Sequence, residues 1–537
     1  MKIKFTNYTY CLFLSLLFAK TAFPQFNTPG YSADYISANH ITMWVSNYGT
    51  GSHNPLTDAA GLYWPSALGP SKTLVFTDGL FWMGKINGAL YFNGTYVRTG
   101  VVPGNIENGI PSNPADKKFR VFKIRPDWEK LPPSTKRNKL ETDYNEWPAD
   151  IGAPYFDLNK DGKYSFNIDK PQIWGDEMLW CIYHDNIPIM DGLYKNDVEV
   201  HVSVYAFAKE NLLGDVVLKK YKLINKGTKT IDSMYVSYYS DPDIGDAEDD
   251  YVGCDSALSL AYAYNGRNSD YFYGDHLPAI GYALLQGPVI KSAINDSAYV
   301  NSKLMAGYKN LSASSFHPIF PQHWGYPPLL PLAQENWYYV NGLSINGSAI
   351  LNPHTGAPTK FPLNGDPYRQ TGWYEGPGGE SPDDLKMILS SGPFTMAPGD
   401  TQEVVYAILA GRSWSNVGSV EQLKLMVPRL RYFHLNYFPD APVVKEEKKQ
   451  YDFKLTQNYP NPFNSQTVIH YQIPLESMVT VKVYDVLGNE VAVLKNEYQK
   501  PGDYEALFNA ENLASGIYII NISAREFFSS KKMILLR

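Results

Sequence analysis

The chain has 537 residues and a formal net charge of −7 at pH 7, and only 19% of its residues are charged. Without a Lys/Arg-rich block, this composition excludes a nucleic-acid-binding protein, because phosphate contacts need clustered cations. Hydrophobic residues make up 44% of the chain, which excludes wholesale disorder and predicts roughly two or three compact units. The 41 tyrosines, 41 glycines and 38 prolines favour strands and turns over helical bundles.

The first residues have the pattern of a signal peptide. A short basic segment precedes an apolar stretch at residues 10–19 that is short for a bilayer span. We expect a signal peptide over residues 1–22, with cleavage between Ala19 and Gln25. No later run of the sequence is apolar and long enough to cross a membrane, so we expect export through the periplasm without a transmembrane segment.

Two cysteines, Cys181 and Cys254, remain once the predicted signal peptide, which contains Cys11, is removed. An even pair in an oxidising compartment could form a disulfide. Two separate buried thiols are the alternative, because a sequence does not give the distance between two Cα atoms.

Residues 26–438 are predicted to form a β-rich cargo region. We expect a loop-rich β-sandwich of one unit, or of two units with a boundary near residues 150–180. Asn-Gly dipeptides at residues 87–88 and 93–94 flank a short apolar run, which is typical of a β-hairpin. Residues 198–207 alternate strictly, which predicts a strand with one apolar face and one polar face. The apolar face carries Val198, Val200, Val202 and Val204, and the polar face carries Glu199, His201 and Ser203.

The second half of this region has weaker patterns. Residues 253–382 are rich in Tyr, Gly and Pro without a clean period, so we expect long loops packed on the sheets. Residues 419–433 have the apolar spacing of a helix, interrupted by Pro428. Residues 439–450 are polar, charged and without period, and are predicted to be a linker.

After this linker, residues 451–537 form a separate pattern of alternating runs. The predicted strands lie at residues 467–473, 479–485, 490–494, 502–508, 516–522 and 532–536. With the turn-rich entry segment, this gives about seven short strands at the spacing of a small Ig-like β-sandwich.

Several motifs in this module resemble a known family. They are Asn-Tyr-Pro-Asn-Pro-Phe-Asn at residues 458–464, Val-Tyr-Asp-Val-Leu-Gly-Asn-Glu-Val from residue 483, and Leu-Ala-Ser-Gly-Ile-Tyr at residues 513–518. Together they are similar to the type A C-terminal sorting domain of the type IX secretion system. The resemblance implies recognition by that secretion machinery, transport across the outer membrane, and a final place outside the cell or on its surface. The cargo region is more loosely similar to uncharacterised exported bacterial proteins, which implies no activity.

The sharpest local motif in the cargo region is at residues 157–163. Oxygen-bearing side chains at alternate positions, followed by a glycine for the sharp turn, are what a calcium loop needs. The predicted ligands are Asp157, Asn159 and Asp161 with their side chains, Lys163 with its carbonyl, and Asp169. The loop departs from the usual pattern at its twelfth position, which is Ile168, so Asp169, Asp176 or Glu177 would have to complete the shell. The alternative is a surface turn rich in Asx residues.

A second acidic segment follows at residues 241–255. Its carboxylates repel one another unless a cation or water separates them. It is therefore a weaker candidate calcium site or a solvated acidic loop. The candidate ligands are Asp241, Asp243, Asp246, Asp249 and Asp250.

The function predicted from these features is an exported surface or secreted protein with a calcium-stabilised binding or structural module. Aromatic segments at residues 262–273 and 323–328 make glycan or surface polysaccharide a candidate partner, although such rings more often pin loops onto sheets. The alternative is a secreted hydrolase acting on polysaccharide or peptide through paired carboxylates. No catalytic residue is assigned.

Overall fold

The computed structural model describes residues 28–95, 100–186, 195–300, 303–321, 332–376, 381–437, 452–524 and 527–537. The chain divides into two compact units, Met1–Ala441 and Pro442–Arg537, called here the large unit and the small unit. The predicted signal peptide and the predicted linker at residues 439–450 lie outside the described residues.

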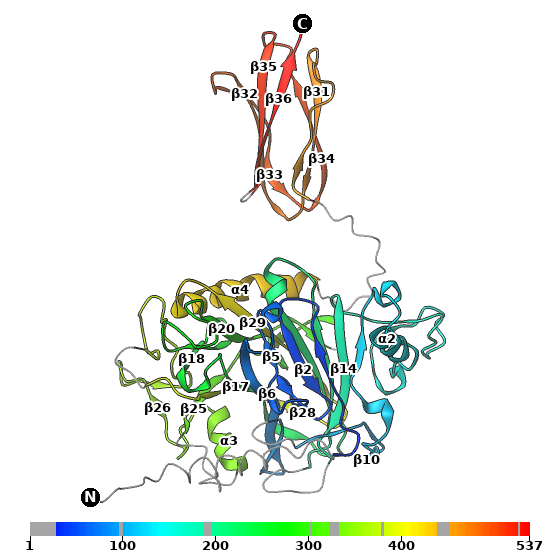
Figure 1. The fold of residues 1–537 in the computed structure, drawn as a ribbon, viewed down its shortest axis with the longest axis vertical. Coiled ribbons are helices and arrows are strands. Elements are labelled where there is room, and N and C mark those ends of the chain that lie inside the picture. The colour runs from blue at the N-terminus through cyan, green and yellow to red at the C-terminus, as the bar shows by residue number, and fades with distance from the viewer. Residues whose placement is uncertain are drawn as a thin grey trace, which may run out of the picture. The chain divides into compact units, whose positions relative to one another are not determined.

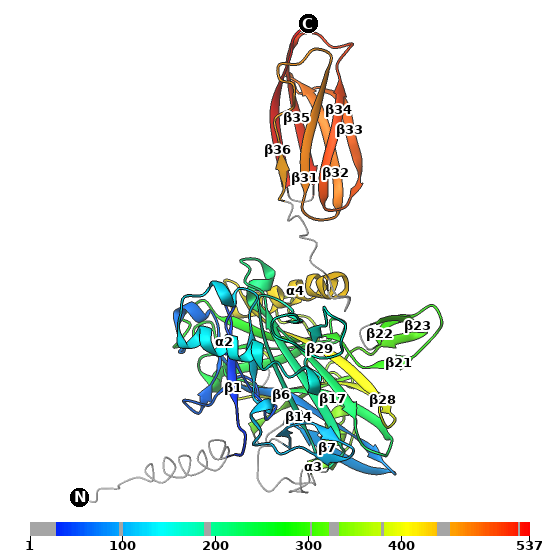
Figure 2. The same cartoon turned by 90° about the vertical axis from the view of Figure 1, so that its right-hand side faces the viewer.

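Two antiparallel sheets form the large unit (Figures 1 and 2). The first sheet has the strand order β1-β2-β5-β6-β17-β28-β25, and β7 pairs with β6. Its strands are β1 (Ala33–Ile36), β2 (Thr42–Ser46), β5 (Leu62–Tyr63), β6 (Thr73–Ile86), β7 (Ala89–Gly94), β17 (Ile231–Pro242), β25 (Ser315–Ile319) and β28 (Lys386–Met396).

The second sheet has the order β11-β14-β15-β16-β29-β20-β19-β18, and β8 pairs with β14. Its strands are β8 (Val102–Pro103), β11 (Phe122–Ile124), β14 (Glu177–His184), β15 (Val198–Ala206), β16 (Val216–Asn225), β18 (Asp250–Asp255), β19 (Leu260–Asn265), β20 (Pro278–Gln286) and β29 (Thr401–Arg412). Strands from both sides of residues 150–180 thus belong to this one sheet.

The inner faces of the two sheets share one hydrophobic core. Trp82 and Tyr238 from the first sheet pack in the same buried cluster as Val200 and Val204 from the second. The alternation predicted for residues 198–207 is confirmed, because all four valines belong to this cluster. The opposite face of β15 is buried as well, with Glu199 and His201 only 2% and 7% exposed.

Helices cover both outer faces. The second sheet is covered by α2 (Thr135–Asn145) and α4 (Asn416–Tyr437), whose apolar side chains join a second buried cluster with strands of that sheet. The first sheet is covered by α3 (Leu332–Val340). The helix predicted over residues 419–433 is confirmed as part of α4, and Pro428 lies inside it.

Burial of both faces of a sheet explains why the prediction of long loops over residues 253–382 was wrong for two strands. Within residues 253–382, expected to be long loops, β19 and β20 are inner strands of the second sheet. Every residue of β19 and β20 is buried. A strand covered on both sides has no polar face, so its sequence lacks the alternation by which strands are recognised.

Short elements complete the large unit. The small strand pairs are β3 (His53–Asn54) with β4 (Ala59–Ala60), β9 (Ile106–Glu107) with β10 (Ile110–Pro111), β12 (Tyr155–Phe156) with β13 (Lys170–Pro171), β21 (Val289–Lys291) with β24 (Tyr308–Asn310), β22 (Ser297–Val300) with β23 (Lys303–Ala306), and β26 (Ile350–Leu351) with β27 (Pro358–Thr359). The 3₁₀ helices are η2 (Ser66–Leu68), η3 (Lys117–Phe119), η4 (Trp128–Lys130), η5 (Ala149–Ile151), η6 (Leu212–Asp215) and η7 (Ala247–Asp249).

The hairpin of β6 and β7 turns at the Asn-Gly dipeptide that predicted it. Ile86 pairs with Ala89, so Asn87 and Gly88 are the two turn residues. Both have positive φ, 53° and 82°, which is the backbone that a two-residue hairpin turn of type I′ requires. The prediction from this dipeptide is confirmed.

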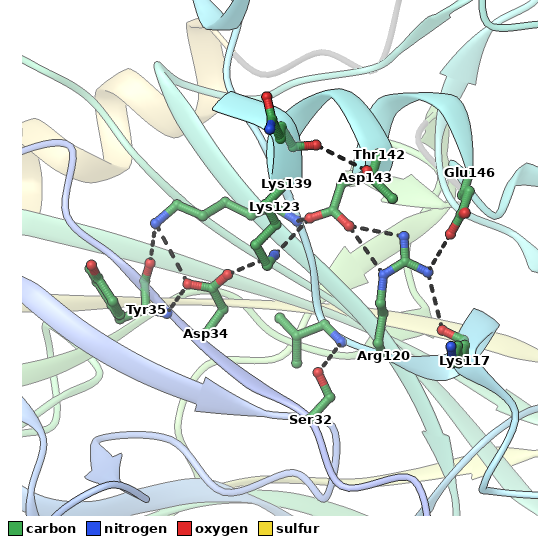
Figure 3. A network of polar contacts seen from close by, with 12 residues as sticks. Ser32, Asp34, Tyr35, Lys117, Arg120, Lys123, Lys139, Thr142, Asp143 and Glu146 are labelled. Carbon is green, nitrogen blue, oxygen red and sulfur yellow. Dashed lines mark hydrogen bonds and ion pairs between the residues drawn. The ribbon is translucent and has the colours of Figure 1, made fainter. Parts of the chain in front are cut away.

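A buried carboxylate fastens α2 to the sheets. Asp143 is 1% exposed and lies between Arg120 and Lys139 (Figure 3). Arg120 donates to Asp143 Oδ1 from Nε at 3.1 Å and from Nη2 at 2.9 Å, and Lys139 Nζ donates to Oδ2 at 2.8 Å. Lys123 N of β11 also donates to Asp143 Oδ2 at 3.0 Å. Lys139 pairs with Asp34 of β1 at 2.9 Å, so α2 is tied to a strand of each sheet.

The two cysteines are separate thiols. Cys181 on β14 and Cys254 on β18 are both free and buried. Of the two alternatives left open by the sequence, the structure has the buried thiols.

The small unit is a β-sandwich of its own. A three-stranded sheet, β30-β31-β34, packs on a four-stranded sheet, β33-β32-β35-β36, around one apolar core. The strands are β30 (Lys454–Leu455), β31 (Gln466–Ile473), β32 (Ser477–Asp485), β33 (Glu490–Gln499), β34 (Gly502–Asn509), β35 (Gly516–Ala524) and β36 (Phe527–Leu535). The expected mainly β fold is confirmed for the chain.

Candidate functional site

The first predicted calcium loop lies between β12 and β13, which pair with each other and close its base. Carboxylate oxygens of Asp157, Asp161 and Asp169 lie within 4.8 Å of one another. Asp157 and Asp161 are at least partly exposed, whereas Asp169 is 2% exposed. The structure therefore brings three of the predicted side chains to one point.

Backbone N–H groups hold these carboxylates in place. Gly162 N donates to Asp157 Oδ2 at 2.9 Å, and Lys163 N donates to Asp161 Oδ1 at 2.8 Å. Asp169 accepts from two more N–H groups, Leu158 N at 2.9 Å and Ser165 N at 2.7 Å. The positive φ of Gly162, 76°, makes the sharp turn for which the sequence motif needs a glycine.

The remaining predicted ligands of this loop have different places. Asn159 is exposed, and its Nδ2 donates to Asp161 Oδ2 at 2.8 Å. Ile168, at the twelfth position, is 49% exposed. The neighbouring Asp169 turns inward, so the carboxylate that the pattern lacks at position twelve is present one residue later.

The five residues of the second predicted site do not form one cluster. Asp241 and Asp243, at the end of β17, meet Asp384, which precedes β28, and their oxygens lie within 4.8 Å of one another. Lys386 joins them, with its Nζ 2.8 Å from Asp241 Oδ1 and 3.2 Å from Asp384 Oδ1. We call these four residues the acidic site.

Burial changes the protonation of the acidic site. It raises the pKa of Asp241 to about 6, against the opposing effect of Lys386. Burial also raises the pKa of Asp243 well above its usual range, and the charges of Asp241 and Asp384 add to this effect. Three carboxylates share one amine here, so a proton or a cation is needed to balance them.

The other three predicted ligands have structural partners. Asp246 caps η7 by accepting from Glu248 N at 3.2 Å. Asp249 accepts from Asn265 Nδ2 at 2.6 Å, and burial raises the pKa of Asp249 to about 6. Asp250 is fully buried and accepts from the backbone N–H of residue 244 at 2.9 Å.

Sequence reasoning missed Asp384 and Lys386. They lie more than 140 residues after Asp241 and reach it only because β28 pairs with β17. The Asp383-Asp384 pair before an apolar run was the available signal, and nothing local connects it to residue 241.

The aromatic segments are mostly structural. Tyr262, Tyr264 and Tyr273 are buried. Two rings nearby are open to solvent: Tyr271 is 89% exposed, and Trp414, which follows β29, is 88% exposed. The Trp414 ring lies against His276 with 5.5 Å between centroids. The second predicted aromatic segment, residues 323–328, lies outside the described residues.

Comparison with known proteins defines the small unit. Residues 457–536 match the family model described as the secretion system C-terminal sorting domain. The resemblance seen in the sequence motifs is thereby confirmed: this segment is a type IX secretion sorting domain. The protein is therefore exported to the cell surface or secreted, and its sorting domain interacts with the secretion machinery.

Comparison gives little about the large unit. No curated protein matches the chain. A solved structure titled as a polysaccharide lyase aligns with 64% of this chain and 35% of its own length, at 11% identity and a TM-score of 0.17. The chain spans about a third of the length of that structure. Among the described residues, no helix is long and apolar enough to cross a membrane.

The acidic site predicts a pH-dependent stability difference. The raised pKa of Asp243 means that the folded protein holds a proton that the unfolded chain releases near pH 4. Relative to Asp243→Asn, the wild type should therefore lose up to about 1.4 kcal/mol of unfolding free energy per pH unit as pH rises above about 4. The difference is measured from the urea midpoints of unfolding of the wild type and Asp243→Asn at a series of pH values, with chelator present. Asp246→Asn, which keeps the η7 cap, should show no such trend, and parallel curves for wild type and Asp243→Asn would contradict the assignment.

Proposed function

We propose that this is an exported protein whose large unit is a calcium-stabilised binding or structural module, carried outside the cell by the sorting domain. The observation that supports calcium best is the loop at residues 157–169. There, three carboxylates converge while backbone N–H groups already orient them.

Calcium suits this loop for physical reasons. It takes six to eight oxygen ligands in flexible geometry, and weak loop sites stay filled at extracellular calcium concentrations. Asp157, Asp161 and Asp169 bring three negative charges together, and the Lys163 carbonyl and the Asn159 side chain would supply further oxygens. The ion would hold the β12–β13 turn on the second buried cluster, against which Tyr155 and Tyr164 pack. Its role would be structural.

Removal of calcium should destabilise the large unit. A site held at 100 times its dissociation constant contributes about 2.7 kcal/mol, so chelator should lower the melting temperature of the purified protein and added calcium should restore it. Asp161→Asn should need more calcium for the same recovery. Glu141→Gln, an equal charge change at an exposed position of α2, should behave as wild type. If chelation leaves the melting temperature of the wild type unchanged, the proposed calcium site is contradicted.

The second candidate function is a hydrolase acting on polysaccharide or peptide. The acidic site favours it, since one carboxyl kept protonated beside an ionised one is the arrangement of an acid–base pair. Asp243 would be the acid, because its pKa is held well above its usual range. Asp241 or Asp384 would be the ionised partner. The calcium-stabilised module stays the first candidate, because Lys386 already occupies one side of this site.

Glycan is the partner that we propose for the binding module. Trp414 and Tyr271 present large rings to solvent, and sugar rings stack on such surfaces because aromatic side chains offer wide, rigid contact area. The two rings lie on the segments that follow β19 and β29 of the second sheet, and each would offer a surface for stacking of a sugar ring.

Transport from the periplasm across the outer membrane should depend on the small unit. Deletion of residues 451–537 should leave the protein in the periplasm, because the sorting domain is what the secretion machinery recognises. Fractionation of cells and medium, with detection of the large unit, measures this. The full-length Asp161→Asn variant, whose sorting domain is intact, is the control and should be exported like wild type. Normal export of the truncated protein would contradict the assignment.

A further inference from the structure

An amine and a carboxylate face each other in the apolar space between the two sheets. Lys219 comes from β16 of the second sheet and Asp78 from β6 of the first. The Lys219 Nζ atom lies 2.8 Å from Asp78 Oδ1. The two residues are only 2% and 0% exposed. They are separated by 141 residues in the sequence.

A tyrosine hydroxyl touches both partners. Lys219 Nζ donates to Tyr238 Oη at 2.8 Å, and Tyr238 Oη donates to Asp78 Oδ2 at 3.0 Å. Burial raises the pKa of Tyr238 well above 10, so its hydroxyl stays protonated and can both accept and donate. The three side chains form a closed path along which a proton can move from the amine to the carboxylate.

The surroundings favour the uncharged form of this pair. Cys181, Tyr183 and Tyr221 belong to the same buried apolar cluster as Tyr238. Two separated charges are costly in such a place, and a transferred proton removes both charges. Burial lowers the pKa of Lys219, against the opposing effect of Asp78. A desolvated, uncharged lysine is a nucleophile.

We propose that Lys219 and Asp78 join covalently, through an isopeptide bond between Nζ and Cγ that links the two sheets. The feature that carries this proposal is the closed triangle of amine, carboxyl and tyrosine hydroxyl within an apolar core.

The reaction balances without a co-reactant. A proton passes from the Lys219 ammonium through Tyr238 to Asp78 Oδ2, which leaves a neutral amine and a carboxylic acid. The lone pair of Nζ then attacks Cγ and forms the C–N bond. As the tetrahedral intermediate collapses, the nitrogen gives up a proton, through Tyr238, to the departing oxygen. The Cγ–Oδ2 bond breaks, and one water leaves. No atom is oxidised or reduced.

The structure has a place for the departing water. A small cavity borders Lys219, and Ser46, Gly51 and Tyr183 are among the residues that line it. Gly51 is required at this position, since a Cβ there would lie 2.2 Å from Asp78 Oδ1 and 2.5 Å from Lys219 Nζ. The close approach of the Gly51 backbone also helps to exclude bulk water from the pair.

A second buried contact between a lysine and an aspartate serves as a control for the proposed link. Lys386 Nζ lies at the same 2.8 Å from Asp241 Oδ1, but it also contacts Asp384. The two carboxylates raise the pKa of Lys386 above its usual value, although burial opposes them. This amine keeps its proton and is not a nucleophile. Distance alone therefore does not predict a link there.

Peptide mapping of the full-length protein tests the proposal. The folded protein should have lost the mass of one water, and trypsin should release residues 73–85 joined to residues 210–220, because a modified Lys219 blocks cleavage after it. Tandem mass spectrometry should place the link at Asp78 and Lys219 and find none between Asp241 and Lys386. Separate, unmodified peptides 73–85 and 210–219 from the folded wild type would overturn the proposal, and so would a water loss located elsewhere.

Variants test the chemistry. Asp78→Asn should still form the link with loss of ammonia in place of water, whereas Lys219→Arg should form none. Tyr238→Phe should slow the link after refolding and remove the pH dependence that proton transfer gives its rate. A link in Tyr238→Phe that forms as fast as in wild type would remove the tyrosine from the mechanism. The decisive measurement is the peptide mapping of the wild type, so the test does not depend on whether a variant folds.

Discussion

The contact between Asp78 and Lys219 is the constraint on which the large unit depends. It is a buried polar link between β6 of the first sheet and β16 of the second, within the apolar interface of the two sheets. A buried pair of this kind is weak evidence for stability, but removal of one partner leaves the other polar group without a partner in the core. The glycine at residue 51, the tyrosine at residue 238 and the cavity beside them are all shaped by that contact.

Local patterns predicted what local physics determines. The Asn87-Gly88 turn, the alternating valines of β15 and the strands of the small unit each follow from neighbours in the sequence. The inner strands β19 and β20 could not be found in this way. They are covered on both faces, so their residues carry no polar side to mark the strand period. Their place is set by pairing with distant strands.

The same distinction separates the two carboxylate clusters. The loop at residues 157–169 is made from one short segment, so its spacing could be compared directly with that of a calcium loop. The acidic site needs Asp384 and Lys386, which reach Asp241 through strand pairing between β17 and β28. Asp246, Asp249 and Asp250 were grouped with it by sequence proximity, yet each has its own structural partner. The density of acidic residues along the chain therefore predicted three ligands that lie elsewhere and missed two residues of the acidic site.

The small unit has its own core and its own family, so the information for export is physically separate from the large unit. The most direct test of this claim is a fusion that carries a signal peptide, a reporter otherwise confined to the periplasm, and residues 438–537. In a host with this secretion system, the reporter should appear on the cell surface or in the medium. A reporter that stays in the periplasm, in cells that export the full-length protein, would contradict the account.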